Sequence, residues 1–156
     1  MDILFILDPF DSLKPEKETS IAMMRAAEAA GHRVVGCLQG DISLDQGKVV
    51  ARMTPLVTTG QDKPWYRAAE PFTAPLSTVD AVIMRKDPPF DMEYVYSTYM
   101  LERAVEQGAR VYNNPAAIRD HNEKFSITAY PELTTDVLVT RDPALTSLGA
   151  GKVTPL

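Results

Sequence analysis

The segment Val82–Tyr96, VIMRKDPPFDMEYVY, passes from an apolar run through a cluster of charges into a helical pattern. The run that it completes, Val79–Met84, is short and mostly apolar, which is typical of a strand buried in a sheet. This strand stops at the charged triplet Arg85–Asp87, and two prolines then restrict the backbone. We interpret the segment as a strand that ends at a ligand-facing edge, where the charged side chains contact the ligand.

A β-α-β unit precedes this segment near the N-terminus. The continuous apolar run Ile3–Leu7 predicts a strand buried on both faces. Apolar residues at helical spacing follow, and they predict a helix that begins near Thr19 or Ser20 and ends at Gly31. A second short apolar run, Arg33–Leu38, predicts the next strand. The right-handed crossover rule makes the two strands parallel.

The same theme returns after the charged triplet. A helix is predicted over Met92–Gln107, with Gly108 as its end, and a strand over Ala109–Asn114. Shorter helical segments are expected at 115–120 and 123–129, and an extended segment at 136–142. The inner side of the longer helix is expected to carry Val95, Tyr99 and either Ala104 or Val105.

Residues 39–78 interrupt the alternation of strands and helices. Val49, Ala51 and Met53 alternate with polar residues after a turn at Gly47, which predicts a small hairpin or edge ribbon. The stretch PWYRAAEPFTAPL, residues 64–76, is rich in proline and aromatic residues, and we interpret it as a packed surface loop.

These elements predict an α/β fold with an open, mostly parallel sheet, helices on both faces and a small hairpin insertion. In such sheets, ligands bind outside the carboxyl ends of the strands. Asp8, the Arg85–Asp87 triplet, Asn113 and Asn114 all follow predicted strands. We therefore expect these polar residues to meet at one edge of the sheet.

Length and composition restrict the class of protein. A chain of 156 residues suits one domain with at most a short appendage. The net charge of −5, without an isolated cluster of basic residues, argues against a nucleic-acid partner. Cys37 is the single cysteine, so no internal disulfide forms and a reducing compartment is expected. The N-terminal apolar run is too short for a membrane span and has no basic leader, which favours a cytoplasmic protein.

Several familiar site types are disfavoured. The turn after the first strand contains no glycine, which argues against NAD or FAD binding. The C-terminal GAGKVTPL, residues 149–156, has Val153 where a phosphate loop needs Ser or Thr. His32 and His121 lack cysteines or carboxylates at ligand spacing, so we expect no metal site. We assign no catalytic residue, and we interpret Cys37 as a small buried hydrophobe.

The charged triplet offers two kinds of contact. Arg85 and Lys86 can bind a carboxylate or phosphate through charge-assisted hydrogen bonds. Asp87 or Asp91 can receive an ammonium group, or can cap the helix that begins near Met92. A solvated loop with no ligand is the simpler interpretation of these charges.

Several segments together resemble the prokaryotic-type glutathione synthetases. They are MRKDPPFDMEYVYSTYMLERA, ILDPFDSLKPEKETSIAMMRAAEAAGH, APLSTVDAVIM, NNPAAIRDHNEKF and YPELTTDVLVTRD. The resemblance extends over residues 1 to about 143, in order and without large gaps. It implies a Rossmann-like pre-ATP-grasp domain at 1–120, followed at 121–156 by the start of a truncated ATP-grasp region.

The resemblance also implies an activity. The family joins γ-glutamylcysteine to glycine with ATP and Mg²⁺, through an acyl phosphate. It implies that Arg85, Lys86, Asp87 and Ser12 lie on the substrate side, and that Lys124 contacts ATP phosphates. In the family, roughly half of the protein should follow the VTRD segment, so we expect no ligase activity from these residues alone.

Other roles stay open at this point. The domain is alternatively a non-catalytic assembly or small-molecule-binding module, and we expect a homo-oligomer because subunits of the family associate. Met92, Tyr96 and Met100 then supply an interface, although a core-facing helix side explains them equally well. A receiver-like domain with Asp8 as phosphoacceptor ranks last, because Asp87 does not lie at the strand tip.

Overall fold

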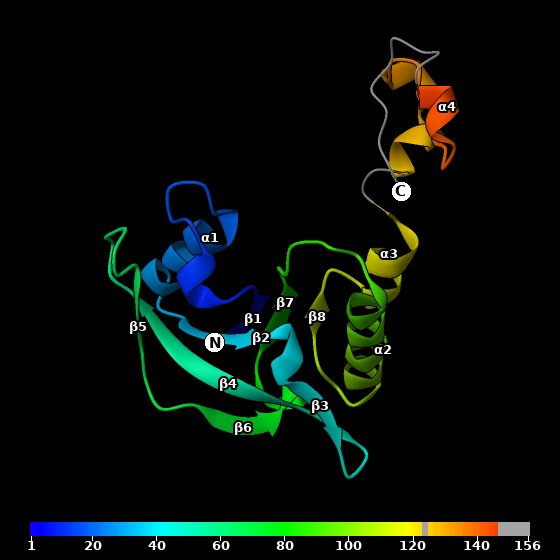
Figure 1. Cartoon of the computed structure of the whole chain (residues 1–156). Coiled ribbons are helices and arrows are strands. Elements are labelled where there is room, and N and C mark those ends of the chain that lie inside the picture. Colours follow the sequence, from blue (N-terminus) through cyan, green and yellow to red (C-terminus); the bar gives the residue numbers. More distant parts are fainter. Residues whose placement is uncertain (123–124, 147–156) are drawn as a thin grey trace. The chain divides into compact units, whose positions relative to one another are not determined.

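A mixed β-sheet organises the N-terminal unit of the chain (Figure 1). The computed structural model describes residues 1–122 and 125–146, and the chain divides into two units, Met1–Ala117 and Ile118–Leu156. In the first unit the strand order is β3-β4-β2-β1-β7-β8, and β5 and β6 also pair with β4. The strands are β1 (Asp2–Leu7), β2 (Arg33–Leu38), β3 (Ile42–Asp45), β4 (Lys48–Thr58), β5 (Tyr66–Ala68), β6 (Phe72–Pro75), β7 (Ala81–Met84) and β8 (Val111–Tyr112).

The centre of the sheet is parallel, as the β-α-β pattern predicted. Strand β1 pairs in parallel with β2 and β7, and β7 pairs in parallel with β8. Ile3, Phe5 and Leu7 of β1 belong to one buried cluster, which helix α1 (Thr19–Ala29) completes with Ile21 and Met24. The intervening residues of β1 are also fully buried. Both faces of β1 are therefore covered, which explains its continuous apolar sequence.

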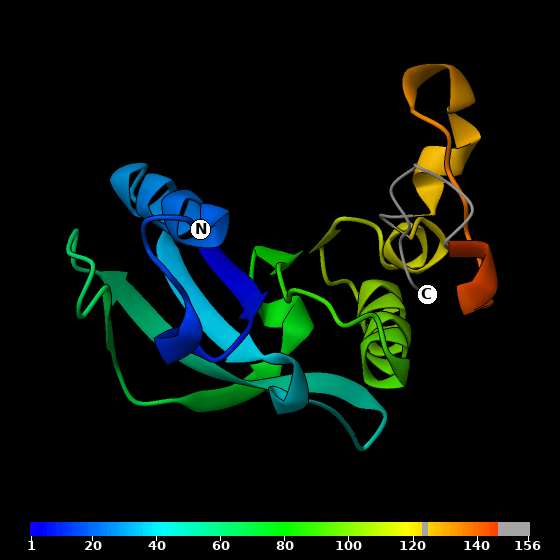
Figure 2. The same cartoon turned by 45° about the horizontal axis from the view of Figure 1, so that its top comes forward.

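The rest of the sheet is antiparallel. Strand β4 pairs in this way with β2, β3, β5 and β6, and Figure 2 shows the sheet as a curled surface. The predicted hairpin is present as β3 and β4, and Val49, Ala51 and Met53 are buried as their alternation indicated. However, β4 is 11 residues long and joins the main sheet. The expectation of a mostly parallel sheet is therefore not confirmed.

The interpretation of residues 64–76 as a surface loop was wrong. This stretch contains β5 and β6, and both short strands pair with β4. Trp65 and Leu76 are buried beside them. Proline is tolerated where a strand is short and lies at a sheet edge, so the prolines did not exclude strands here.

The positions predicted for the helix C-termini agree with the structure better than those predicted for the N-termini. Gly31 and Gly108 adopt φ values of 79° and 95° just beyond α1 and beyond α2 (Met92–Glu106), as C′ residues do. The expected caps at Thr19 or Ser20 are wrong, because Glu18 occupies the N-cap position without a side-chain cap bond. Ser20 instead lies inside the first turn of α1 and is fully buried.

The buried side of helix α2 includes Ala104, one of the two alternatives expected there, but not Tyr99. Its buried residues are Ser97, Thr98, Leu101 and Ala104, whereas Tyr99 and Val105 are about half exposed. Ser97 and Thr98 donate their hydroxyl protons to carbonyl groups within the helix, so burial leaves neither hydroxyl unpaired. Helix α1 packs on β2 and β4, and α2 packs on β3 and β4. Helices on both faces of the sheet are not confirmed.

The second unit begins within α3 (Pro115–Asp120), whose bounds match the prediction. The helical segment expected at 123–129 is present in part as a 3-10 turn over Ser126–Ala129, and residues 123–124 lie outside the described ranges. A second 3-10 turn (Pro131–Leu133) and α4 (Pro143–Thr146) follow. No strand is found over 136–142, where an extended segment was expected, and Leu138 forms only an isolated bridge.

Gly36 is required by the packing of the loop that follows β1. A Cβ at this position would lie 2.7 Å from Leu56 and 2.8 Å from the ring of Phe10. We expect Gly36→Ala to lower the free energy of unfolding by about 1–3 kcal/mol, because both neighbours must move. The fluorescence of Trp65 should change as well, since its indole N–H donates to the carbonyl of Phe10 at 2.9 Å.

Urea unfolding followed by tryptophan fluorescence measures both effects, because Trp65 is the single tryptophan. Gly40→Ala is the matched control, since a Cβ at Gly40 would meet nothing within 4 Å. Equal stabilities of the two variants would contradict the packing argument.

Candidate functional site

The charged residues that follow β1 and β7 meet at one edge of the sheet. The two strands are parallel neighbours with Ile6 beside Met84, so their carboxyl ends coincide. The ammonium group of Lys86 lies 2.7 Å from Oδ1 of Asp8. The other oxygen of Asp8 accepts the backbone N–H of Asp87 at 2.9 Å. The predicted convergence of Asp8 with the charged triplet is therefore present in the structure.

Lys86 is engaged within this cluster. Besides its ion pair, it donates to the carbonyl of Asp87 at 2.6 Å. The side chains of Lys86 and Asp8 are 19% and 23% exposed, so the pair is partly shielded from water. Removal of either partner would leave a poorly hydrated charge, which is more damaging than loss of an exposed ion pair. The contacts of Lys86 thus hold the loop in place.

Arg85 is held from two directions. Its backbone N–H donates to the carbonyl of Ile6 at 2.9 Å, and its Nε–H donates to the hydroxyl of Ser20 at 3.1 Å. Within the described part of the chain, neither terminal nitrogen of the guanidinium has a hydrogen-bond partner. Arg85 therefore presents two donors in a plane, which is the arrangement that a carboxylate or phosphate group binds.

The two aspartates considered as ammonium acceptors have different roles. Oδ1 of Asp91 accepts the backbone N–H of Tyr94 at 2.9 Å and caps α2, as one of the two interpretations required. The carboxylate of Asp87 is exposed and has no hydrogen-bond partner among residues 1–122 and 125–146. Of the two, Asp87 is the carboxylate that remains available to a ligand.

Tyr94 is a member of the site that the sequence did not reveal. Burial raises the pKa of its hydroxyl above the ordinary value, Asp87 and Asp8 add to the rise, and Arg85 opposes it. Tyr94 therefore stays protonated and offers a neutral donor within the field of these three charges. Its place in the first turn of α2, three residues after the cap Asp91, is the signal that points to it.

Ser12 lies apart from these contacts. It ends the 3-10 turn Phe10–Ser12, and its hydroxyl donates to the carbonyl of Pro9 at 2.6 Å. Trp65 and Tyr66 fix the same loop through Phe10 and Asp11, at 2.9 and 2.8 Å. No hydrogen bond joins Ser12 to the charged triplet in the described residues, so its place on the substrate side stays a prediction.

A hollow of about 480 Å³ adjoins the charged edge. Lys86 and Pro89 contribute to it from the loop after β7, and Gln39 and Gly40 from the turn after β2. The N-terminal half of α2 forms the other side, with Asp91, Glu93, Tyr96, Ser97 and Met100. The hollow lies outside the carboxyl ends of β2 and β7, which is the place where α/β sheets bind small ligands.

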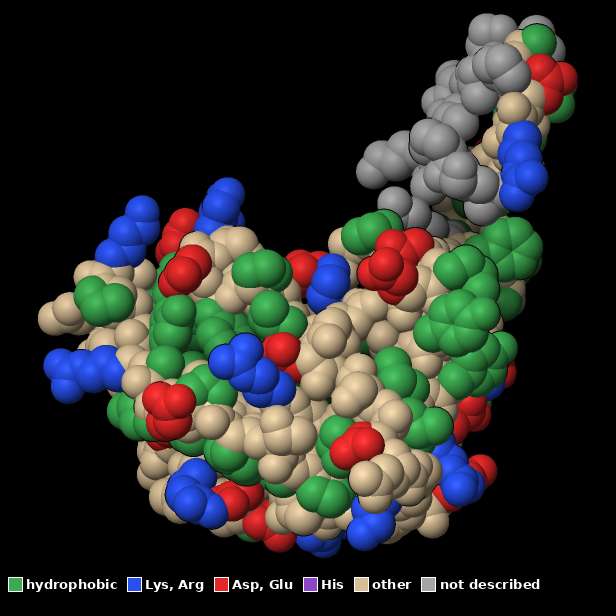
Figure 3. Space-filling model, turned by 60° about the horizontal axis from the view of Figure 1, so that its bottom comes forward, with side chains coloured by type: hydrophobic (Ala, Val, Ile, Leu, Met, Phe, Trp, Pro, Cys, Tyr) green, Lys and Arg blue, Asp and Glu red, His purple; other side chains and the backbone are tan. Residues whose placement is uncertain are grey.

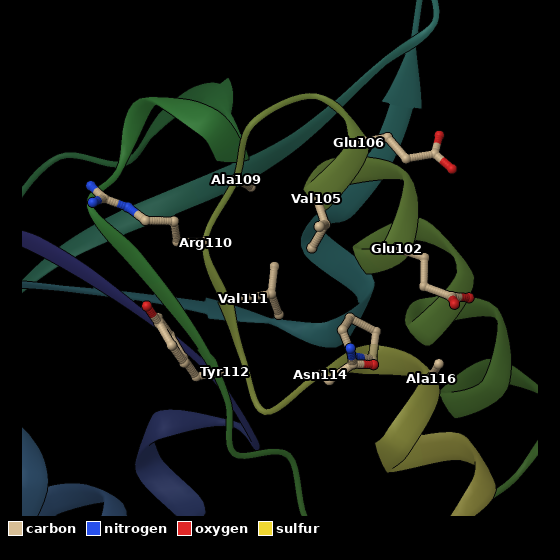
Figure 4. Close-up of a pocket in the computed structure, with 10 residues that line it drawn as sticks. Glu102, Val105, Glu106, Ala109, Arg110, Val111, Tyr112, Asn114 and Ala116 are labelled. Carbon is tan, nitrogen blue, oxygen red and sulfur yellow. The ribbon is translucent and has the colours of Figure 1, made fainter.

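A second hollow, of about 490 Å³, lies between α2 and β8 (Figure 4). Figure 4 shows Glu102 and Glu106 pointing away from Val111, whereas Arg110 and Tyr112 lie on the other side of the strand. Its remaining lining is mostly small and apolar. Because its charged side chains do not converge, we do not assign it a ligand.

The structure gives Asn114 a structural role and leaves the role of Lys124 untested. Lys124 lies outside the described residues. Asn114 accepts the backbone N–H of Ala117 at 3.2 Å and caps α3. In residues 1–122 and 125–146 no group of three or more His, Cys, Asp or Glu side chains is placed to hold a metal ion. The same residues include no helix with the length and apolarity needed to cross a membrane.

Cys37 is fully buried in β2, as its surroundings in the sequence indicated. Burial raises the pKa of its thiol to about 12, and Asp41 adds to the rise. Above its ordinary pKa the thiol ionises in the unfolded chain but not in the folded one. The free energy of unfolding should therefore fall between about pH 9 and pH 12, by up to about 1.4 kcal/mol per pH unit.

Urea unfolding of the wild type and of Cys37→Ala at pH 8, 9 and 10 tests this dependence. We expect a shallower decline in the variant above pH 9, although its stability at pH 8 is lower because a buried sulfur is lost. Tyrosines ionise in both proteins and cancel in the comparison. Parallel pH profiles would show that the thiol is not buried as described.

The fold and the strand-end cluster together define an α/β domain that presents fixed charges at one edge of a partly parallel sheet. Residues 1–119 match the family described as "Prokaryotic glutathione synthetase, N-terminal domain". The chain therefore belongs to this family, as the resemblance of its segments indicated.

Curated relatives named glutathione synthetase are similar over most of the chain. The protein of Bordetella pertussis is 54% identical over 151 residues, which cover 92% of this chain and 47% of the relative. That of Ralstonia nicotianae is 51% identical, with 91% and 44% covered. That of Pseudomonas putida is 44% identical, with 88% and 44% covered. The chain spans about half the length of the curated relatives it matches.

Proposed function

We propose that residues 1–120 form the substrate-side domain of an ATP-dependent carbon–nitrogen ligase, which joins γ-glutamylcysteine to glycine. Membership of the glutathione synthetase family supports this reaction. The main support for the substrate-side role of this domain is the pair formed by Arg85 and Asp87. At the carboxyl edge of the sheet, an oriented guanidinium and an exposed carboxylate lie two positions apart in the sequence, and both remain available.

This pair suits the chemistry of the proposed substrate. The γ-glutamyl end of γ-glutamylcysteine carries an α-carboxylate and an α-ammonium group on one carbon atom. Arg85 would bind the carboxylate through two parallel hydrogen bonds, and Asp87 would receive the ammonium group. Lys86 would support both residues through Asp8 rather than contact the substrate first.

ATP and Mg²⁺ are part of the proposed reaction of the complete protein. The described residues include no cluster of side chains that fits Mg²⁺, so we assign no step to the metal in this chain. We propose that Lys124 contacts ATP phosphates and that residues 121–156 begin the ATP-grasp region. Because acyl-phosphate formation needs cations at the phosphates, this chain should bind substrate without turnover. A cytoplasmic location stays a prediction.

Calorimetric titration with γ-glutamylcysteine tests the substrate-side role. We expect the wild-type chain to bind it, and Arg85→Met to weaken binding by about tenfold or more, because charge-assisted hydrogen bonds are lost. A coupled assay should detect no ADP release that depends on γ-glutamylcysteine and glycine together.

Arg110→Met is the matched control for this titration. Arg110 forms an exposed ion pair with Asp80, and both residues precede strands and so lie at the opposite edge of the sheet. Equal affinities of the Arg85→Met and Arg110→Met variants would contradict the substrate role. Substrate-dependent ADP release would contradict the absence of turnover.

A second candidate function is assembly of identical subunits, and the outer side of α2 favours it. Met92, Tyr96 and Tyr99 follow one another at helical spacing, and each is at least half exposed. Figure 3 shows hydrophobic side chains gathered on the side of the molecule where α2 lies in Figure 1. Aromatic residues and methionine are enriched in protein interfaces. In an antiparallel pair of α2 helices about a two-fold axis, Tyr96 would oppose Tyr99 of the second copy.

Sedimentation equilibrium tests this assembly. We expect the wild-type chain to dimerise and Tyr96→Glu to shift the equilibrium to the monomer, because a carboxylate would then be buried against aromatic rings. Leu44→Glu, at an exposed position on β3, is the control and should dimerise normally. A monomeric wild type would exclude this role and leave the α2 surface for another polypeptide.

A further inference from the structure

A series of hydrogen bonds between three polar side chains joins the start of α1 to the end of β7. Nε of Arg85 donates to Oγ of Ser20 at 3.1 Å, and this hydroxyl lies 3.1 Å from Oε1 of Glu18. An arginine Nε can only donate, so the hydroxyl accepts from it and gives its own proton to the carboxylate. Ser20 is fully buried, and both of these hydrogen bonds join it to charged neighbours.

This contact decides which edge of the guanidinium a ligand can use. A carboxylate can bind either the Nε edge or the pair of terminal nitrogens. Ser20 occupies the Nε edge, so only the two terminal nitrogens remain. The backbone bond from Arg85 to Ile6 fixes the other end of the residue. Both ends of a long, flexible side chain are thus restrained before any ligand arrives.

We propose that Ser20, supported by Glu18, is a positioning residue that holds Arg85 for end-on, bidentate binding of a carboxylate. This inference rests on the proposed function, in which that carboxylate is the α-carboxylate of γ-glutamylcysteine. An arginine that is already ordered loses less conformational freedom on binding, so the contact increases affinity without touching the substrate.

A purely structural role for Ser20 would have a different signature. A buried serine in the first turn of a helix stabilises the fold in any protein, and its loss then lowers the unfolding temperature alone. Ser20 differs because its partner is the one guanidinium at the ligand edge whose terminal nitrogens have no partner in the described residues. Loss of its hydroxyl must therefore change the mobility of Arg85 and the affinity for a carboxylate together.

The experiment compares Ser20→Ala, Ser20→Thr and Arg85→Lys in the whole chain. Calorimetry with γ-glutamylcysteine should show binding about tenfold weaker in Ser20→Ala, as expected when a bond to a charged group is lost. Ser20→Thr, which keeps the hydroxyl, should bind within about threefold of the wild type. If the extra methyl group of threonine prevents folding, Glu18→Ala is measured in place of Ser20→Thr. We expect Glu18→Ala to bind about threefold more weakly than the wild type, because the hydroxyl of Ser20 loses its acceptor.

A second measurement needs no ligand. The Nε–H resonance of Arg85, identified by its absence from the NMR spectrum of Arg85→Lys, reports the bond to Ser20 through its rate of exchange with water. We expect this exchange to be at least about tenfold faster in Ser20→Ala than in the wild type, because a free guanidinium is open to solvent. Thermal unfolding of each variant confirms that the compared proteins are folded.

The outcomes separate this inference from the function on which it rests. Faster exchange and weaker binding in Ser20→Ala, with recovery in Ser20→Thr, support the positioning role. Unchanged exchange overturns it, whatever happens to binding. Suppose that exchange is faster in Ser20→Ala but its affinity is unchanged, while Arg85→Lys binds more weakly than the wild type. This result overturns the positioning role of Ser20, and the proposed function stands. Equal binding by the wild type and Arg85→Lys, or no binding by either, overturns the proposed function and with it the ligand role of Ser20.

Discussion

The parallel pairing of β1 with β7 is the constraint on which the rest of the site depends. Its register sets Ile6 beside Met84, so the residues two positions further on leave the sheet together. These residues are Asp8 and Lys86, and their charged groups lie 2.7 Å apart. The remaining oxygen of Asp8 accepts the N–H of Asp87. A single carboxylate thus neutralises a cation and accepts a backbone N–H of the loop, because the two strands end at the same edge.

The parts of this arrangement that the sequence predicted depend on local patterns. Short apolar runs at 3–7 and 33–38 identified two buried strands, and the crossover rule gave their direction. Gly31 marked a helix end because it adopts a positive φ. Convergence of Asp8 with Arg85–Asp87 followed from these elements, since the carboxyl ends of neighbouring parallel strands share an edge.

The parts that it did not predict depend on contacts between distant residues. Strand β4 is antiparallel to β2 and carries β5 and β6, and no local pattern in residues 64–76 indicates this pairing. Ser20 was expected as a helix cap, but Arg85, 65 positions away, draws its hydroxyl into the site. The burial of Ser97 rather than Tyr99 depends likewise on how α2 packs on the distant strands β3 and β4.

The balance of charge at the strand ends indicates which kind of ligand the site suits. Arg85 and Lys86 carry two positive charges, and Asp8 and Asp87 carry two negative charges, so the cluster is neutral overall. A polyphosphate favours a site with excess positive charge, and here it would meet two carboxylates. A zwitterionic amino-acid group meets one opposite charge for each of its own and leaves the cluster neutral. The site is therefore better matched to a zwitterionic group, such as that of the proposed peptide substrate, than to the phosphates of a nucleotide.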